Sequence, residues 1–397
     1  MRLVFVFTLA ISFICTPCRG EDPAPTFHHD NQRTGRTSNL GPKVPRLRWS
    51  FRSESSLEAS PVISRDGTIY LASTDGRLYA FTSRGILKWT FAAGDAIVAT
   101  PAIGPDGIVH LGDIAGTYYA VRPDGSLKWS RQLTGGALER RVTAPPAVAG
   151  SGQSFVGSWN DRLYSFGPDG SLLWTYAFEG EGQIGAAPAL DLAGNVYLAT
   201  HDPANKSSIA VYRFDSASPA VVWKFTEDMG IDRNRIISSP AIDVSRGRLY
   251  VGAARDIDGC MYAIDIADGK RAFRADFPKG IISSPAVGRD GTLFVGCLDG
   301  KLYALDPATG NARWSFATGA PYVMGSPTVD GASVIYVGDS DGVLHAISAV
   351  GQEQWSCRLG ANIASAPCIA DDGAIYVTSF DSTLYVIGEM RGRRIPR

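Results

Sequence analysis

The chain has 397 residues, of which 45% are hydrophobic and 19% are charged, a composition typical of a globular protein with a large core. Its 38 lysines and arginines nearly balance 39 aspartates and glutamates, so the formal net charge is −1. Nucleic-acid-binding proteins usually carry a basic excess or a basic stripe, so this balance argues against a nucleic-acid partner.

Residues 1–20 have the pattern of an export signal. An early arginine precedes the apolar run Leu3–Ile14, and small residues stand at the positions that precede a cut before Glu21. The run is short for a bilayer span, although a membrane anchor is the alternative interpretation. Neither Cys15 nor Cys18 follows the small residue that a lipidated cysteine needs, and no later segment is long and apolar. We therefore expect export to the periplasm or cell surface, with no transmembrane segment after cleavage.

Residues 21–43 form an N-terminal extension, which a single strand follows at 44–51. This strand resembles the outer strand of the repeat described next, but no first three strands precede it. The last repeat shows the opposite defect, because no outer strand follows Ile387. We predict that the N-terminal strand completes the last repeat and closes a ring, which removes exposed sheet edges.

An internal repeat extends over residues 44–388. Each copy has a proline strand, then an aromatic residue such as Tyr79, replaced by His345 in one copy, and finally a strand with a large aromatic residue. Only Trp159 lies outside this tryptophan series. The final aromatic residues, which we expect to pack between repeats, are Trp49, Trp89, Trp129, Trp174, Trp223, Phe273, Trp314 and Trp355.

Each copy reads as four short strands separated by Gly-containing turns, and the middle two are apolar on both faces. Blades of a β-propeller have this pattern, because both faces of each sheet pack on neighbouring blades. We predict an all-β, eight-bladed propeller of four-stranded antiparallel blades. The alternative is a solenoid, which needs polar end caps. A basic tail at 389–397 follows the ring, and we expect a monomer.

The segment Ala304–Trp314 matches the motif A-x-D-x-x-x-G-x-x-x-W, and Ala263–Phe273 is a second close copy. On these motifs the chain resembles the pyrroloquinoline-quinone-type repeat propellers over about residues 44–388. The resemblance implies that each tryptophan packs between adjacent blades while its indole N–H binds backbone, as buried tryptophans generally require a partner. The stretch 29–36 also resembles a leader seen in secreted propellers of this type, which seals one end of the ring.

The resemblance leaves two functions open. Quinone-dependent dehydrogenases of this kind commonly combine the quinone (PQQ) and calcium with adjacent cysteines, whereas Cys260, Cys297, Cys357 and Cys368 are dispersed here. The chain is also similar in size to the propeller lipoprotein of the outer-membrane β-barrel assembly machine, a scaffold without cofactor, but it lacks a good lipidation site. We favour a non-catalytic exported scaffold without cofactor, catalytic residue or metal; a PQQ-dependent oxidoreductase or a subunit of one is the alternative. A hydrolase or lyase whose site the sequence hides is a third.

Metal ligation has little support in the residue pattern. The dispersed cysteines could form one disulfide in an oxidising compartment, but small buried side chains are the simpler interpretation. Repeated Asp-Gly pairs fit hairpin turns better than calcium loops, because no copy supplies the full set of oxygen ligands. The five histidines have no metal-binding spacing.

Polar and charged residues cluster in the connections just before the proline strands. In a propeller these connections surround one mouth of the channel, and loops on a rigid scaffold often carry recognition. An ordinary solvated rim is the alternative. We expect this rim to bind an envelope protein or peptide, or an anionic glycan, because positive residues outnumber negative ones. The candidate residues are Asp95, Arg140, Arg141, Glu181, Arg233, Arg235, Lys279, Tyr322 and Asn362.

Overall fold

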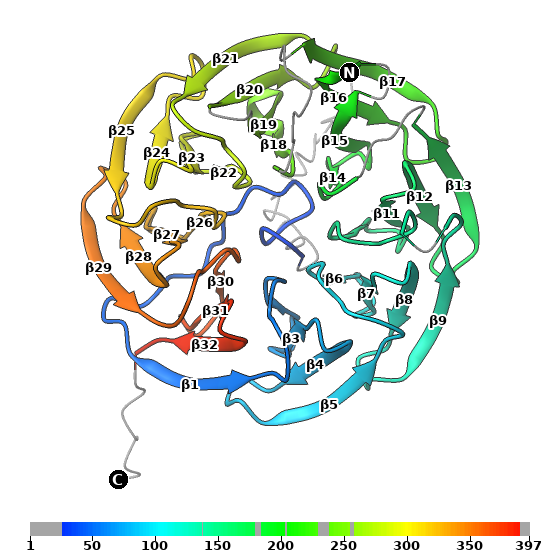
Figure 1. Ribbon diagram of the computed structural model, residues 1–397, viewed down its shortest axis with the longest axis horizontal. Coiled ribbons are helices and arrows are strands. Elements are labelled where there is room, and N and C mark those ends of the chain that lie inside the picture. The colour runs from blue at the N-terminus through cyan, green and yellow to red at the C-terminus, as the bar shows by residue number, and fades with distance from the viewer. Residues whose placement is uncertain are drawn as a thin grey trace, which may run out of the picture.

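Eight four-stranded antiparallel sheets stand around a central axis in the computed structural model (Figure 1). The structure describes residues 26–389 except 137, 179–183, 203–204, 229–237 and 255–257. The fold is the predicted eight-bladed β-propeller. The proposed signal at 1–20 and all but the first residue of the tail at 389–397 lie outside the described residues.

Blade 1 shows the plan of every blade: β2 (Val62–Ile63) is innermost, then β3 (Ile69–Ala72), β4 (Arg77–Phe81) and β5 (Leu87–Ala92) at the outer edge. Blades 2 to 4 consist of β6 (Ala102–Ile103), β7 (Val109–Gly112), β8 (Thr117–Val121), β9 (Leu127–Gln132); β10 (Ala147–Val148), β11 (Ser154–Ser158), β12 (Arg162–Phe166), β13 (Leu172–Ala177); and β14 (Ala189–Leu190), β15 (Val196–Asp202), β16 (Asn205–Phe214), β17 (Val221–Asp228). Blades 5 to 7 consist of β18 (Ala241–Asp243), β19 (Arg248–Ala254), β20 (Gly259–Asp265), β21 (Arg271–Phe277); β22 (Ala286–Val287), β23 (Leu293–Gly296), β24 (Lys301–Leu305), β25 (Ala312–Ala317); and β26 (Thr328–Val329), β27 (Ile335–Gly338), β28 (Val343–Ile347), β29 (Glu353–Arg358). A short 3-10 turn, η1 (Val244–Arg246), joins β18 to β19.

Blade 8 is built from both ends of the propeller. Its strands β30 (Cys368–Ile369), β31 (Ile375–Ser379) and β32 (Thr383–Ile387) are completed by β1 (Leu47–Arg52). β1 pairs antiparallel with β32 and places Phe51 opposite Leu384. This confirms the predicted closure of the ring: β1 takes the outer position that β5 has in blade 1, and β32 is paired on both sides.

The core lies between blades. β3 and the last four residues of β4 are buried throughout, as expected for strands that are covered on both faces. One hydrophobic cluster joins Tyr70 and Leu78 of blade 1 to Ile103 and Leu111 of blade 2, and similar clusters follow around the ring. Each blade therefore depends on its neighbours for burial of its apolar side chains.

The tryptophans of the series lie at these blade interfaces. Their indole N–H groups donate to backbone carbonyls of the following blade, at 3.1 Å from Trp49 to Ser83 and at similar lengths in the other six. At Gly85 a Cβ atom would lie 2.8 Å from the Trp49 ring, so the turn needs glycine there. Phe273 cannot donate, but its ring covers Gly310 in the same way.

Candidate functional site

The connections between strands gather at opposite ends of the channel, because successive strands of a blade are antiparallel. We call one end the rim face: it carries the loops between blades and the hairpins that join second to third strands. The other end, the hairpin face, carries the hairpins that join first to second and third to fourth strands. The two faces are the candidate functional surfaces.

Residues 26–41, which we call the strap, occupy the centre of the ring before the chain runs outward to β1 (Figure 1, dark blue). The strap contacts the ends of the innermost strands, next to the hairpin face. Its hydrogen bonds follow consecutive blades: Leu190 N to Asn31 O, Ile242 N to Gln32 O, Val287 N to Thr34 O, Val329 N to Gly35 O, and Asn39 Nδ2 to Ile369 O, all between 2.7 and 2.9 Å.

Arg33 anchors the strap and is fully buried. Its guanidinium donates to the carbonyl oxygens of Pro188 at 3.1 Å and Pro146 at 2.8 Å. It also donates to Thr26 Oγ1 at 2.6 Å and to the Phe27 carbonyl at 2.8 Å. Burial lowers the pKa of Arg33 to about 9, which leaves it protonated at neutral pH. The hydrogen bonds therefore hold a charged group between two blades and the strap itself.

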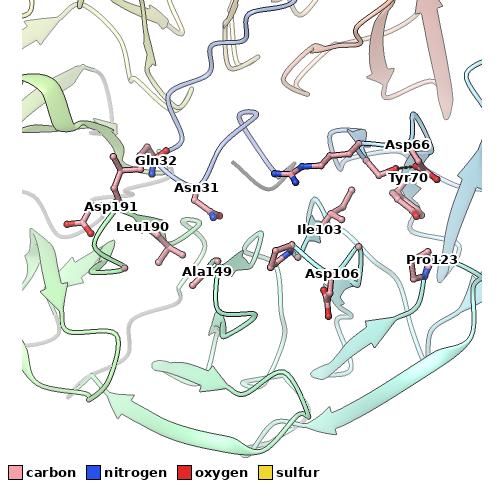
Figure 2. Close-up of a pocket in the computed structure, with 18 residues that line it drawn as sticks. Asn31, Gln32, Asp66, Tyr70, Ile103, Asp106, Pro123, Ala149, Leu190 and Asp191 are labelled. Carbon is pink, nitrogen blue, oxygen red and sulfur yellow. Dashed lines mark hydrogen bonds between the residues drawn. The ribbon is translucent and has the colours of Figure 1, made fainter. Parts of the chain in front are cut away.

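Two cavities open on the hairpin face beside the strap. The side cavity, about 510 Å³, lies along the hairpins of blades 1 to 4, with Asn31 and Gln32 on the strap side and Ile103 between them and Tyr70 (Figure 2). Asn31 Nδ2 donates to the Val148 carbonyl at 2.7 Å, while its Oδ1 is buried with no hydrogen-bond partner among the described residues.

The second cavity, which we call the mouth cavity, is larger, about 1160 Å³. Its wall combines strap residues with hairpins of blades 1, 5, 6 and 8, and Arg36, Arg65 and Arg289 all line it. The repeat pattern did not single out these three arginines, because they lie in the strap and in hairpins of different blades. Their proximity to one cavity is a product of the ring.

The structure distributes the predicted rim residues around the rim face. Asp95 and Lys279 are exposed on separate loops between blades. Tyr322 and Asn362 stand on two successive loops between blades, and Asn362 Nδ2 lies 4.0 Å from Met324 Sδ. Only Arg140 and Arg141 adjoin each other. The remaining predicted rim residues lie outside the described residues: Glu181, Arg233 and Arg235.

An ordered cluster surrounds the arginine pair. The Arg141 guanidinium lies over the Trp159 ring, 5.3 Å from its centre, and Trp159 Nε1 donates to Thr143 Oγ1 at 2.7 Å. Arg140 Nε donates to the Ala115 carbonyl at 2.6 Å, and the Leu138 side chain beside it is 70% exposed. Trp159 is the tryptophan outside the repeat series, a departure from the pattern that sequence reasoning did not connect with the rim.

His345 is buried and bridges two carboxylates. Its Nε2 lies 3.0 Å from Asp339 Oδ2 and its Nδ1 lies 2.8 Å from Glu353 Oε1. Burial alone would lower the pKa of His345, but these two hydrogen bonds raise it above its usual value. Tyr303 at the same position of blade 6 donates to Asp299 at 2.6 Å. His345 is therefore a structural variant of a tyrosine–aspartate pair.

The dehydrogenases that the chain resembles combine adjacent cysteines with a calcium site. Among the described residues, no three histidine, cysteine or acidic side chains are grouped to hold a metal ion. None of Cys260, Cys297, Cys357 and Cys368 forms a disulfide, and none is adjacent to another in the sequence. Burial raises the pKa of Cys297 and of Cys368 to about 12, so neither is a ready nucleophile.

The described residues include no helix with the length and apolar character to cross a membrane. A family model described as "Outer membrane protein assembly factor BamB" matches residues 32–139, 119–275 and 205–395. The outer membrane protein assembly factor BamB of Nitrosomonas eutropha is 31% identical over 106 residues, which cover 27% of this chain. That match spans only 25% of the relative's own length.

Solved structures resemble the chain over most of its length. BamB from Moraxella catarrhalis has a TM-score of 0.70 at 19% identity, and the match covers 87% of this chain and 100% of that one. A europium-containing methanol dehydrogenase has a TM-score of 0.79 at 14% identity, covering 93% and 99%. At such identities the similarity shows the fold alone, and the fold is common to an outer membrane protein assembly factor and a dehydrogenase.

Proposed function

The chain belongs to the family described as the outer membrane protein assembly factor BamB, and on that premise we propose that it is a non-catalytic scaffold of the cell envelope that binds a protein partner through its rim face. The family description supports an envelope location and a role in assembly. The proposal concerns the face of the molecule that carries the predicted rim residues.

The observation that carries the proposal is the stacked pair of Arg141 and Trp159, with the exposed Leu138 three residues before Arg141 in the same loop. Arginine and tryptophan are enriched among the residues that dominate protein interfaces, and an exposed leucine beside them adds apolar area. The cluster is held in place before any partner arrives, since Trp159 N donates to the Arg141 carbonyl at 3.0 Å and Ser158 Oγ donates to it at 3.1 Å. Such preorganisation lowers the entropy lost on binding.

The experiment is a comparison of partner capture by matched variants. The purified chain is immobilised, partners are captured from an envelope extract and identified, and each is then titrated as a purified protein. We expect the double variant Leu138→Ala/Arg141→Glu to lose about tenfold or more in affinity for the specific partner. Leu192→Ala/Arg84→Glu changes the same residue types at exposed positions of the hairpin face and should bind normally.

Two outcomes would contradict the proposal. Equal affinity of the partner for wild type and for Leu138→Ala/Arg141→Glu would remove the rim face as the binding surface. Capture of an anionic glycan in place of a protein, lost in the same variant, would change the ligand class. Circular dichroism and thermal unfolding of each variant establish that the propeller is intact.

The quinoprotein oxidoreductase is the alternative that the shared fold supports. It is tested by titrating the purified protein with pyrroloquinoline quinone and calcium and by measuring dye-linked alcohol oxidation. Saturable quinone binding with turnover would replace the scaffold proposal. No quinone binding under conditions that load a known dehydrogenase would eliminate the alternative.

A further inference from the structure

We propose that the mouth cavity of the hairpin face is a second binding site, which takes an acidic and partly apolar peptide segment of a protein partner. The site is at the opposite end of the channel from Arg141 and Trp159, and the strap that lines it occupies the centre of the ring (Figure 1). The inference does not depend on the rim face, so either proposal can fail alone.

The cavity has the size and shape of a ligand site. Its volume of about 1160 Å³ exceeds what one side chain fills and suits a segment of several residues. The strap supplies one wall through residues 36–39, and the hairpins of blades 1 and 8 supply others through residues 62–67 and 368–372. These hairpins are anchored in the propeller, so the cavity is formed before a ligand binds.

The charges of the cavity are unbalanced toward positive. Arg36, Arg65 and Arg289 are exposed. Of the three aspartates that line the cavity, Asp372 pairs with Arg48 at 2.6 Å. The exposed Asp371 accepts an amide hydrogen bond from Asn39 at 3.1 Å and keeps its negative charge. Asp30 is buried, and burial raises its pKa, which weakens its negative charge. The three arginines therefore face one exposed and charged carboxylate, Asp371, and this excess of positive charge favours an anionic ligand.

A buried hydroxyl without a partner lines the same cavity. Tyr376 is fully buried, and its Oη makes no hydrogen bond among the described residues. At the same strand position of blades 4 and 7, the tyrosine hydroxyls donate to the acid of the preceding hairpin: Tyr197 to Asp191 and Tyr336 to Asp330. In blade 8 the position of that acid is occupied by Ala370, which offers the hydroxyl no side-chain acceptor. The hydroxyl is thus left as a donor for a ligand oxygen.

The apolar part of the wall favours a peptide over a glycan. Val62, Ile63, Ile369 and Ala370 line the cavity beside the arginines. A peptide that alternates acidic and apolar side chains can pair with the arginines and also pack on the apolar part of the wall. An anionic glycan has no apolar side chains to pack there. Concave shape also distinguishes the site from a flat surface for lipid headgroups.

The test uses fluorescence anisotropy of a short labelled peptide of alternating glutamate and valine with the full chain. We expect saturable binding that weakens as salt rises. Arg36→Glu/Arg289→Glu should weaken it about tenfold, since two ion pairs are reversed. Arg84→Glu, a single charge reversal on the same face at a residue that does not line the cavity, should leave affinity unchanged. Tyr376→Phe should weaken binding about threefold, and Tyr336→Phe should not.

Three results would overturn the inference. The first is equal peptide affinity of Arg36→Glu/Arg289→Glu and wild type. The second is an equal loss in Arg84→Glu, which would mean unspecific attraction to the face. The third is tighter, arginine-dependent binding of dextran sulfate or of phosphatidylglycerol vesicles than of the peptide. Peptide binding that survives in Leu138→Ala/Arg141→Glu separates this site from the rim face.

Discussion

Replacement of Arg33 by methionine tests how the strap is held. Methionine has a similar length and removes only the guanidinium group. The carbonyl oxygens of Pro146 and Pro188 would then lie buried without their donor, as would the acceptors within the strap. Because these carbonyls belong to blades 3 and 4, the loss affects the attachment of the strap to the ring and not only the strap itself.

The expected cost follows from the number of acceptors left unpaired. Each buried acceptor that loses its donor costs about 1–3 kcal/mol, partly offset where water enters. Removal of one partner from a buried charged network usually costs about 3–5 kcal/mol in total. We therefore expect Arg33→Met to lower the free energy of unfolding, or of strap release, by about 3–5 kcal/mol.

Two measurements separate strap release from global unfolding. Urea denaturation reports the free energy of unfolding of the ring, and hydrogen exchange read by mass spectrometry reports opening of residues 26–41. Arg36→Met is the matched control, because Arg36 is exposed and its loss should change stability by no more than about 0.5 kcal/mol. If Arg33→Met unfolds and exchanges like wild type, the guanidinium does not hold the strap and the reasoning is wrong.

Three further changes have defined outcomes. Because the pKa of His345 is raised in the folded state, its pairing with Asp339 and Glu353 stabilises the fold fully below about pH 6.5. This stabilisation is lost as the pH rises through the folded pKa. In urea titrations over that rise, His345→Tyr should therefore lose less stability than wild type. Burial lowers the pKa of His29 to about 4, so stability should fall as pH drops from about 6.5 toward 4, and His29→Gln should flatten that fall in the same titrations. Trp314→Phe keeps the ring but loses its hydrogen bond to the next blade, and should cost about 1 kcal/mol in urea unfolding; no change would mean that packing alone secures the interface.

The fold could be predicted from the sequence because each repeat has the same pattern of strands and turns. A proline strand, Gly-containing hairpins and an aromatic outer strand specify one blade, and eight copies specify the ring. The incomplete ends added the closure, since the strand at 44–51 had no blade of its own and the last repeat had no outer strand. Both features depend on short-range pattern and on counting, which a single sequence contains.

The candidate sites were only partly accessible. The loops between blades were identified as a rim, and Arg140 and Arg141 stand there in an ordered cluster with Trp159. The stacking of Arg141 on Trp159 joins two connections on the rim face and could not be deduced from the repeat. The sequence also marked residues 29–36 as a leader that seals the ring, but not its path from blade to blade.

The sequence by itself determined the blades, their number and the way the ring closes, because these features repeat and each copy is local. Only the tertiary structure decided which residues share a cavity. Arg36, Arg65 and Arg289 come from the strap and from hairpins of blades 1 and 6, and Tyr376 comes from blade 8. They meet because closure of the ring directs the same hairpin of every blade toward one channel end, where residues distant in the chain surround a common space.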